Sequence, residues 1–322
     1  MIRITIIGLG LIGTSIGMAL RSANEKESPL GAIEVVGYDQ HARAVKAARG
    51  RLAIDREART LPDAVRDAHI VLIATPVQTI HDLFQQLATL LPAGTIVTDT
   101  ASTKAQVGAW AAALLPSGID FIGGHPMAGK EQAGGSAAEP NLFRDAIYCL
   151  CPAHNARAEA VEAVEAIVTT IHAKPYYIDP IEHDAYVAGI SHLPFLLSTA
   201  LVEATGRSPG WKEMAPLAAT GFRDLSRLAS GDPKMHTDIC MTNRDALVRW
   251  INETISLLVD IRDAIQQGDA AQIDALFTHA KALRDEWLVS RPNLRPGEDA
   301  FANPMQVERP NLFGFRRPDA RK

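Results

Sequence analysis

The fold of this chain is decided by a stretch near the start of its sequence, "IIGLGLIGTSIG" (6–17). The stretch begins as an apolar strand and continues, over 11–23, with the composition of a helix. Between the two, Gly8 permits a tight turn, Gly10 lets a ligand approach the backbone, and Gly13 allows the helix and strand to pack closely. Because the unpaired N–H groups and positive dipole end of a helix attract phosphate, the spacing predicts a turn that binds a dinucleotide pyrophosphate.

A second strand, "IEVVGYD" (33–39), ends in an acid. A carboxylate there can accept both ribose hydroxyls of NAD and repels the 2′-phosphate of NADP, so NAD is the expected cofactor, although His41 and Arg43 lie close by. The end of the strand at 69–75 would line the same edge of the sheet. A glycine turn with a purely structural role is the alternative. The predicted cofactor-binding residues are Gly8, Gly10, Leu11, Ile12, Gly13, Asp39, Thr75 and Pro76.

The first half of the chain alternates short strands, rich in Ile and Val, with longer helical segments rich in Ala. This pattern predicts an α/β fold, a Rossmann-type doubly wound parallel sheet covered by helices on both faces. The expected strands are 2–8, 33–39, 69–75, 94–100, 120–125, 146–151 and 174–178, and the expected helices are 11–23, 41–50, 77–91, 103–115 and 155–172.

After about residue 180 the pattern becomes all-helical. The expected helices are 183–205, 213–230, 233–267, which Asp232 caps and Pro233 opens, and 269–289. The chain is therefore predicted to comprise a dinucleotide-binding domain (1–180), a helical domain for substrate binding and dimerisation (181–290) and an irregular, proline-rich tail (291–322).

Composition excludes several classes of protein. The 322 residues carry a net charge of −5, so no basic field favours nucleic acid. Cys149, Cys151 and Cys240 cannot form a disulfide framework and lack zinc-site spacing, which favours a reducing cytoplasm and no metal. No apolar run is expected to reach the roughly 18–20 residues that a membrane helix needs.

A histidine at a strand end is the first candidate for chemistry. His125 lies in "FIGGHPMAGKEQAG" (121–134), between glycines and a proline. Asp99 and Ser102, in "DTASTK" (99–104), end the preceding strand and belong at the same edge of the sheet. A histidine can take a proton from a hydroxyl while hydride leaves the same carbon, and a nearby serine could hold the imidazole or touch the cofactor. A histidine satisfied by backbone groups is the alternative.

Five motifs occur in an order that resembles the prephenate/arogenate dehydrogenase family over roughly residues 1–290. The motifs are "GLGLIGTSIG", "DTASTK", "GGHPMAGKEQAG", "HDAYVAGISHLP" and "GFRDLSRLASGDPKMHTDI". The resemblance implies NAD-dependent oxidative decarboxylation of prephenate to 4-hydroxyphenylpyruvate, or of arogenate to tyrosine, in tyrosine biosynthesis. It also implies a homodimer formed through the helical domain, and the apolar stripes over 245–289 fit an interface or an intramolecular core.

The resemblance assigns roles to single residues. It makes His125 the catalytic histidine, Ser102 its strand-end serine and Arg227 the residue that binds a substrate carboxylate. By themselves, Arg227 would be a solvated helix charge and His192 a core histidine. The substrate-site residues that it implies are Arg227, His192, Glu131 and Asp224, the last two in one ionic network; Arg223, four residues before Arg227, is a possible second anion contact.

Departures from the family pattern leave the substrate open. Phe195 stands where many relatives have a second histidine, and His236 where many have tryptophan. Together with Gln132 they are expected near the end at which prephenate and arogenate differ. Two other functions remain alternatives: a dehydrogenase of the β-hydroxyacid or imine-reducing kind, and a catalytically silent NAD-binding sensor.

Overall fold

The structure is a computed structural model that describes residues 1–23, 28–130, 132 and 134–290. These residues belong to two compact units, the first covering Met1–Thr254 and the second beginning at Ile255. The expected tail, 291–322, lies outside the described residues. The boundary expected between 180 and 181 stays a prediction.

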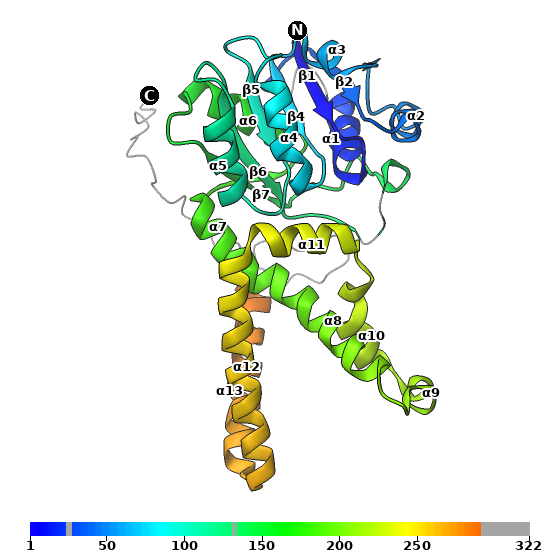
Figure 1. Ribbon diagram of the computed structural model, residues 1–322, viewed down its shortest axis with the longest axis vertical. Coiled ribbons are helices and arrows are strands. Elements are labelled where there is room, and N and C mark those ends of the chain that lie inside the picture. The colour runs from blue at the N-terminus through cyan, green and yellow to red at the C-terminus, as the bar shows by residue number, and fades with distance from the viewer. Residues whose placement is uncertain (24–27, 131, 133, 291–322) are drawn as a thin grey trace, which may run out of the picture. The chain divides into compact units, whose positions relative to one another are not determined.

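The first unit is built on one eight-stranded sheet with the strand order β3-β2-β1-β4-β5-β6-β7-β8 (Figure 1). The first six positions give the order 3-2-1-4-5-6 of a doubly wound dinucleotide-binding fold, which confirms the predicted fold class. The strands are β1 (Ile2–Ile7), β2 (Ile33–Tyr38), β3 (Arg56–Glu57), β4 (Ile70–Ile73), β5 (Ile96–Asp99), β6 (Asp120–Pro126), β7 (Ile147–Pro152) and β8 (Lys174–Tyr177).

Two features of the sheet differ from the expectation. The strand β3 has only two residues, too few to leave a periodic signal in the sequence. The sheet is parallel, as predicted, except at β7, which pairs antiparallel to β6 with His125 opposite Cys149. Between β6 and β7 the described residues form only the single 3₁₀ turn η1 (Gly135–Ala137) and no crossover helix, so the chain can return antiparallel.

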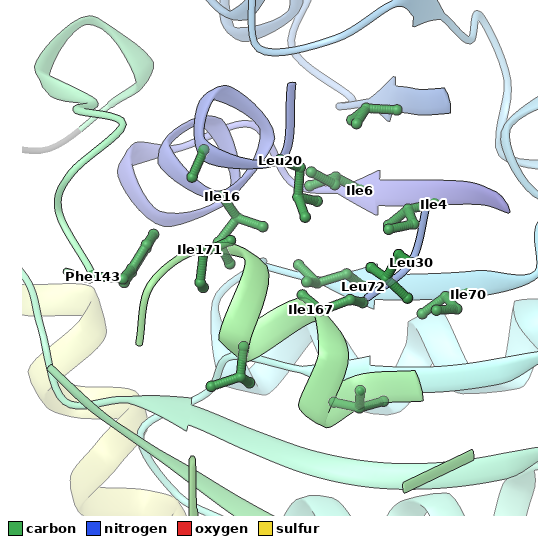
Figure 2. Packing of buried hydrophobic residues seen from close by; sticks show 14 of the residues in the cluster. Ile4, Ile6, Ile16, Leu20, Leu30, Ile70, Leu72, Phe143, Ile167 and Ile171 are labelled. Carbon is green, nitrogen blue, oxygen red and sulfur yellow. The ribbon is translucent and has the colours of Figure 1, made fainter. Parts of the chain in front are cut away.

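Helices cover both faces of the sheet because β1 is apolar on both sides. Ile4 and Ile6 pack with Ile16 of α1 and Ile167 of α6 in one cluster (Figure 2). Ile7 belongs to a second cluster with α3, α4 and α5 on the other face. The helices of this half are α1 (Leu11–Ser22), α2 (Ala42–Gly50), α3 (Leu61–Val65), α4 (Val77–Leu87), α5 (Ala105–Leu114) and α6 (Ala158–Thr170), with a single turn η1 (Gly135–Ala137).

A long helical stretch follows the sheet. It consists of α7 (Pro180–Val187), the π-helical turn η2 (Ala188–His192) and α8 (Leu193–Gly206). Contrary to the expectation, this stretch of 27 residues contains an 18-residue window with a mean hydropathy of 1.5, so it is long and apolar enough to cross a membrane. That is weak evidence for a membrane span, because a core helix of a soluble protein has the same composition. Its buried polar residues His183, Asp184 and His192 identify it instead as a helix that packs against protein.

Two of the remaining expected helices are divided in the structure, whereas the helix expected over 269–289 is present as α13 (Ala270–Ser290). The predicted helix over 213–230 is divided where Pro216 interrupts it. The predicted helix over 233–267 begins as expected, with Asp232 accepting hydrogen bonds from Lys234 N and Met235 N, but it breaks at Asn243. The elements are α9 (Trp211–Met214), η3 (Ala215–Leu217), α10 (Thr220–Ser226), η4 (Arg227–Ser230), α11 (Pro233–Thr242), α12 (Arg244–Gln267) and α13 (Ala270–Ser290).

Candidate active site

The glycine turn has the geometry that its spacing predicts. Gly8 has a φ of +96°, and a Cβ there would lie 2.5 Å from the carbonyl oxygen of Ala74. A Cβ on Gly13 would lie 2.0 Å from the carbonyl oxygen of Gly8. A Cβ on Gly10 would meet no atom within 4 Å. Gly8 and Gly13 are therefore required by packing, whereas Gly10 leaves open space at the N-terminus of α1.

Asp39 lies beside this turn. Its Oδ2 accepts a hydrogen bond of 2.8 Å from Leu9 N, and its Oδ1 accepts one of 2.8 Å from His41 N. Each carboxylate oxygen keeps a further lone pair for a ligand. Thr75 lies on the other side of the turn, where a Cβ on Gly8 would be 2.9 Å from Thr75 Cγ2, and Pro76 precedes the first residue of α4. Leu11 and Ile12 form the first turn of α1 and are half-buried.

A buried ion pair ties the end of β5 to β6. Asp99 is fully buried and its Oδ2 accepts hydrogen bonds from Lys104 Nζ and Ala101 N, while its Oδ1 accepts one of 3.1 Å from Gly124 N. Lys104 Nζ also donates to the carbonyl oxygen of Gly124 at 2.6 Å. Because every charge in this group has a partner, the strand that carries His125 is held in place from its neighbour.

His125 is buried at the end of β6, and its partner is another histidine. His125 Nδ1 lies 2.9 Å from His183 Nε2, and His183 Nδ1 lies 2.8 Å from Asp184 Oδ1. Ser102, expected to hold the imidazole, is half-buried and has no hydrogen-bond partner within the part of the chain that the structure describes. Its side chain is therefore available to a ligand.

The protonation of His125 follows from its surroundings. Burial, together with the positive charges that His183 and Lys104 can carry, holds the pKa of the His125 imidazole well below its ordinary value of 6.5. The ring is therefore neutral at neutral pH, which is the state in which a histidine can accept a proton.

His192 occupies the last position of the π-helical turn η2, where the extra residue per turn changes the direction of the side chain. It is 1% exposed, and burial lowers its pKa to about 4. Its Nδ1 lies 3.3 Å from Asn243 Nδ2, whereas its Nε2 is buried without a partner among the described residues. A structural core histidine would have both nitrogens satisfied, so the open Nε2 favours a role in binding a ligand.

The predicted anion-binding residues lie elsewhere in the first unit. Arg223 and Asp224, on α10, are exposed and form an ion pair of 3.1 Å with each other. Arg227, at the start of η4, is also exposed. The structure does not bury these three side chains in the histidine network. Glu131, which the sequence places in an ionic network with Asp224, lies outside the described residues.

The two residues that depart from the family pattern contact each other. The rings of Phe195 and His236 are stacked, with centroids 4.1 Å apart and planes 3° from parallel. The ring centroid of His192 lies 6.0 Å from that of Phe195. Gln132 is exposed. Phe195 and His236 thus form one aromatic surface beside the ring of His192.

Within the described residues, no group of three or more histidine, cysteine, aspartate or glutamate side chains could hold a metal ion.

Two domain-family models match the chain in succession. The first, described as the nucleotide-binding domain of prephenate dehydrogenase, matches residues 26–177, and the second, described as the dimerization domain of prephenate dehydrogenase, matches residues 179–279. The chain belongs to the prephenate dehydrogenase family. The first match begins after the glycine turn, so the assignment of Gly8, Gly10 and Gly13 rests on their geometry.

Individual relatives of this prephenate dehydrogenase family member cover most of its length. It is 34% identical to prephenate dehydrogenase of Bacillus subtilis (strain 168), over 88% of this chain and 75% of the relative. It is 30% identical to cyclohexadienyl dehydrogenase of Zymomonas mobilis, over 87% of this chain and 92% of the relative. The crystal structure of Synechocystis arogenate dehydrogenase superposes with a TM-score of 0.74 at 30% identity, covering 89% of this chain and 100% of that one.

The structure adds residues that the sequence did not single out. His183 and Asp184 contact or support His125, Lys104 anchors the end of β5, and Asn243 orients His192. Adjacent histidine and aspartate at the start of an apolar helix were a usable signal, since charged residues are rarely buried without a partner. Asn243 gave no signal in the sequence, because the apolar residues on either side of it keep a continuous helical spacing.

Proposed function

We propose that this protein catalyses the NAD-dependent oxidative decarboxylation of prephenate to 4-hydroxyphenylpyruvate, a step of tyrosine biosynthesis. The observation that carries the proposal is His125, a buried and neutral histidine at the carboxyl edge of a dinucleotide-binding sheet. Membership of the prephenate dehydrogenase family and the names of the relatives support the same reaction.

The residues around the glycine turn fit NAD. The space beside Gly10 and the N-terminus of α1 suits a pyrophosphate, and Asp39 suits the ribose hydroxyls. Leu11, Ile12, Thr75 and Pro76 would complete the site. When bound, NAD⁺ supplies the acceptor for a hydride.

The chain's own residues would accept a proton from the substrate and orient it. His125 accepts the proton of the ring C4 hydroxyl as that carbon loses a hydride. The ring carboxylate then leaves as CO2, and the ring becomes aromatic. The protein thus contributes a positioned, buried base, and a positioned base is typically worth 10²–10⁴-fold in rate.

Substrate binding would use side chains other than His125. His192 would donate a hydrogen bond from Nε2, the nitrogen that has no partner among the described residues. Arg227 would bind a substrate carboxylate, since a guanidinium matches that geometry with two parallel hydrogen bonds. Ser102, Arg223, Asp224 and Glu131 are proposed as further residues of the site.

Arogenate is the second candidate substrate. Prephenate and arogenate differ only in a keto against an amino group on the side chain, and the relatives carry names for both substrates and for dual specificity. The stacked pair of Phe195 and His236 beside His192 supports a substrate preference that differs from that of relatives with the usual residues at these positions.

The experiment is to follow NADH formation with purified protein and NAD⁺, offering prephenate and arogenate separately. We expect turnover with prephenate. Turnover with arogenate alone would move the product to tyrosine. No turnover with either, in protein that binds NAD⁺, would overturn the proposal in favour of an NAD-binding sensor.

We also infer a homodimer formed through helices of 245–289 and a cytoplasmic location. Large apolar side chains are exposed on α12 and α13 in the second unit, which supports an interface. The cysteines among the described residues, Cys149, Cys151 and Cys240, are all free, which fits a reducing compartment.

A further inference from the structure

His183 and Asp184 form a chain of hydrogen bonds that ends at the proposed catalytic histidine, His125. Asp184 Oδ1 lies 2.8 Å from His183 Nδ1, and His183 Nε2 lies 2.9 Å from His125 Nδ1. The two rings are nearly perpendicular, 69° apart, with centroids separated by 5.1 Å. The two rings therefore meet edge to face, and the hydrogen bond joins a nitrogen of His125 to a nitrogen of His183. Both His183 and Asp184 are almost completely buried on α7.

The direction of the first hydrogen bond follows from the partners of Asp184. Its Oδ1 accepts a hydrogen bond of 2.7 Å from Lys104 N, and its Oδ2 accepts one of 2.9 Å from Ala105 N. Backbone N–H groups can only donate, so both carboxylate oxygens act as acceptors here. The hydrogen between Asp184 and His183 must then lie on His183 Nδ1.

The direction of the second hydrogen bond follows from the first. In a neutral imidazole one nitrogen carries the hydrogen and the other is an acceptor. With its hydrogen on Nδ1, neutral His183 presents a lone pair at Nε2. His125 must therefore donate from Nδ1, which leaves the lone pair of His125 on Nε2.

The charged groups around His125 are compatible with this arrangement. The ammonium group of Lys104 is engaged by Asp99 and by the carbonyl oxygen of Gly124, and Cys149 lies opposite His125 on β7. His192 is directed by Asn243, whose Nδ2 must face the carbonyl oxygen of Asp184, at 2.8 Å, because that oxygen can only accept. A protonated His183 would carry hydrogen on both ring nitrogens and reverse the hydrogen bond to His125.

We infer that His183 and Asp184 are a positioning pair that holds His125 in the tautomer with hydrogen on Nδ1, so that Nε2 is the atom that accepts the substrate proton. The inference rests on the proposed function, in which His125 is the base. If the pair were absent, His125 could place its hydrogen on Nε2, and that nitrogen could no longer accept a proton. Holding a catalytic histidine in the wrong tautomer can cost about 10⁴-fold in turnover in another enzyme class.

The direct test is ¹⁵N NMR of full-length protein labelled in its histidine rings, at neutral pH and without substrate. The His125 signals are identified by their loss in His125→Asn. We expect a protonated Nδ1 and an unprotonated Nε2. The opposite tautomer would overturn the inference. Because this readout needs no turnover, it stands apart from failure of the proposed function, which would appear as no NADH formation with either substrate.

Two substitutions of His183 test the same point by kinetics. His183→Phe removes the acceptor for His125 Nδ1, and we expect kcat to fall by roughly 10²-fold, the upper end of losses seen when a group that orients a metal-binding histidine is removed. His183→Gln restores an oxygen that can accept from Nδ1, and we expect it to recover about a tenth of the wild-type kcat while KM for NAD⁺ stays unchanged. His154→Gln, at an exposed site, is the matched control.

Equal losses in His183→Phe and His183→Gln would contradict the inference, because a purely structural role would not distinguish them. Wild-type turnover in His183→Phe would contradict it as well. Thermal unfolding and NAD⁺ binding of each variant show that the comparison is made on folded protein. If His183→Phe does not fold, the NMR measurement on the unsubstituted protein decides the question.

Discussion

At the scale of single residues, His125 is the side chain on which the proposed chemistry depends. His125→Asn keeps a polar side chain of similar size but removes the base, so we expect kcat to fall by about 10²–10⁴-fold. NAD⁺ binding, measured by calorimetry, should persist, because the glycine turn and Asp39 are untouched. The control is His154→Asn, at an exposed position. Wild-type turnover in His125→Asn would remove His125 from the catalytic role.

The pKa of His125 also predicts how activity depends on pH. The unprotonated ring is the active form, and burial with nearby positive charge holds its pKa well below the ordinary 6.5. A lower pKa keeps the base unprotonated to lower pH. The decline of kcat/KM on the acid side should therefore have its midpoint at a pH below 6.5. The measurement is a pH profile in constant-ionic-strength buffers. An acid limb above that pH would contradict the environment that the structure gives His125.

At the scale of elements, the strand–turn–helix unit separates two kinds of glycine. A Cβ on Gly13 would lie 2.0 Å from a backbone oxygen, so Gly13→Ala should lower the thermal unfolding midpoint. A Cβ on Gly10 would meet no atom within 4 Å, so Gly10→Ala should leave that midpoint nearly unchanged and weaken NAD⁺ binding. The two variants are each other's control. Unchanged NAD⁺ affinity in Gly10→Ala would favour a purely structural turn.

A second prediction at this scale concerns Asn243, which separates α11 from α12. Asn243 Nδ2 donates to the carbonyl oxygen of Asp184 and faces His192 Nδ1. Asn243→Leu would leave those buried acceptors without a donor, and we expect the free energy of unfolding to fall by about 2 kcal/mol. Chemical denaturation measures the loss. Asn252→Leu, at an exposed position on α12, should have little effect, and an equal loss there would show that the hydrogen bonds of Asn243 do not matter.

At the scale of the whole molecule, the exposed apolar side chains of the second unit support the proposed homodimer interface. Ile255, Leu258, Ile265 and Phe277 are each at least half exposed on α12 and α13. Phe277→Glu should shift sedimentation from a dimer toward a monomer, since a buried unpaired charge is costly. Gln85→Glu adds the same charge to an exposed position on α4 in the first unit and should leave the dimer intact. A wild-type monomer would contradict the proposed dimer.

Much of the fold could be predicted because its signals are local. The run from Ile2 to Gly17 contains a complete strand, turn and helix start, and most later strands, though not β3, are short apolar runs of their own. Predictions failed where a distant partner decides the outcome. Asn243 breaks a helix because of hydrogen bonds to residues about fifty positions away, and β7 runs antiparallel because of how the chain returns after β6.

The sequence by itself determined the class of fold, the glycine turn, the acid at the end of β2 and the histidine at the end of β6, because spacing along the chain expresses each of them. Only the tertiary structure decided which groups surround that histidine. His183 and Asp184 lie almost sixty residues from His125 along the chain, on a helix, α7, that packs against α5, and from there His183 contacts His125 directly. Burial then sets the charge of the ring, and hydrogen-bond direction sets its tautomer. Both depend on distances in space that no local pattern records.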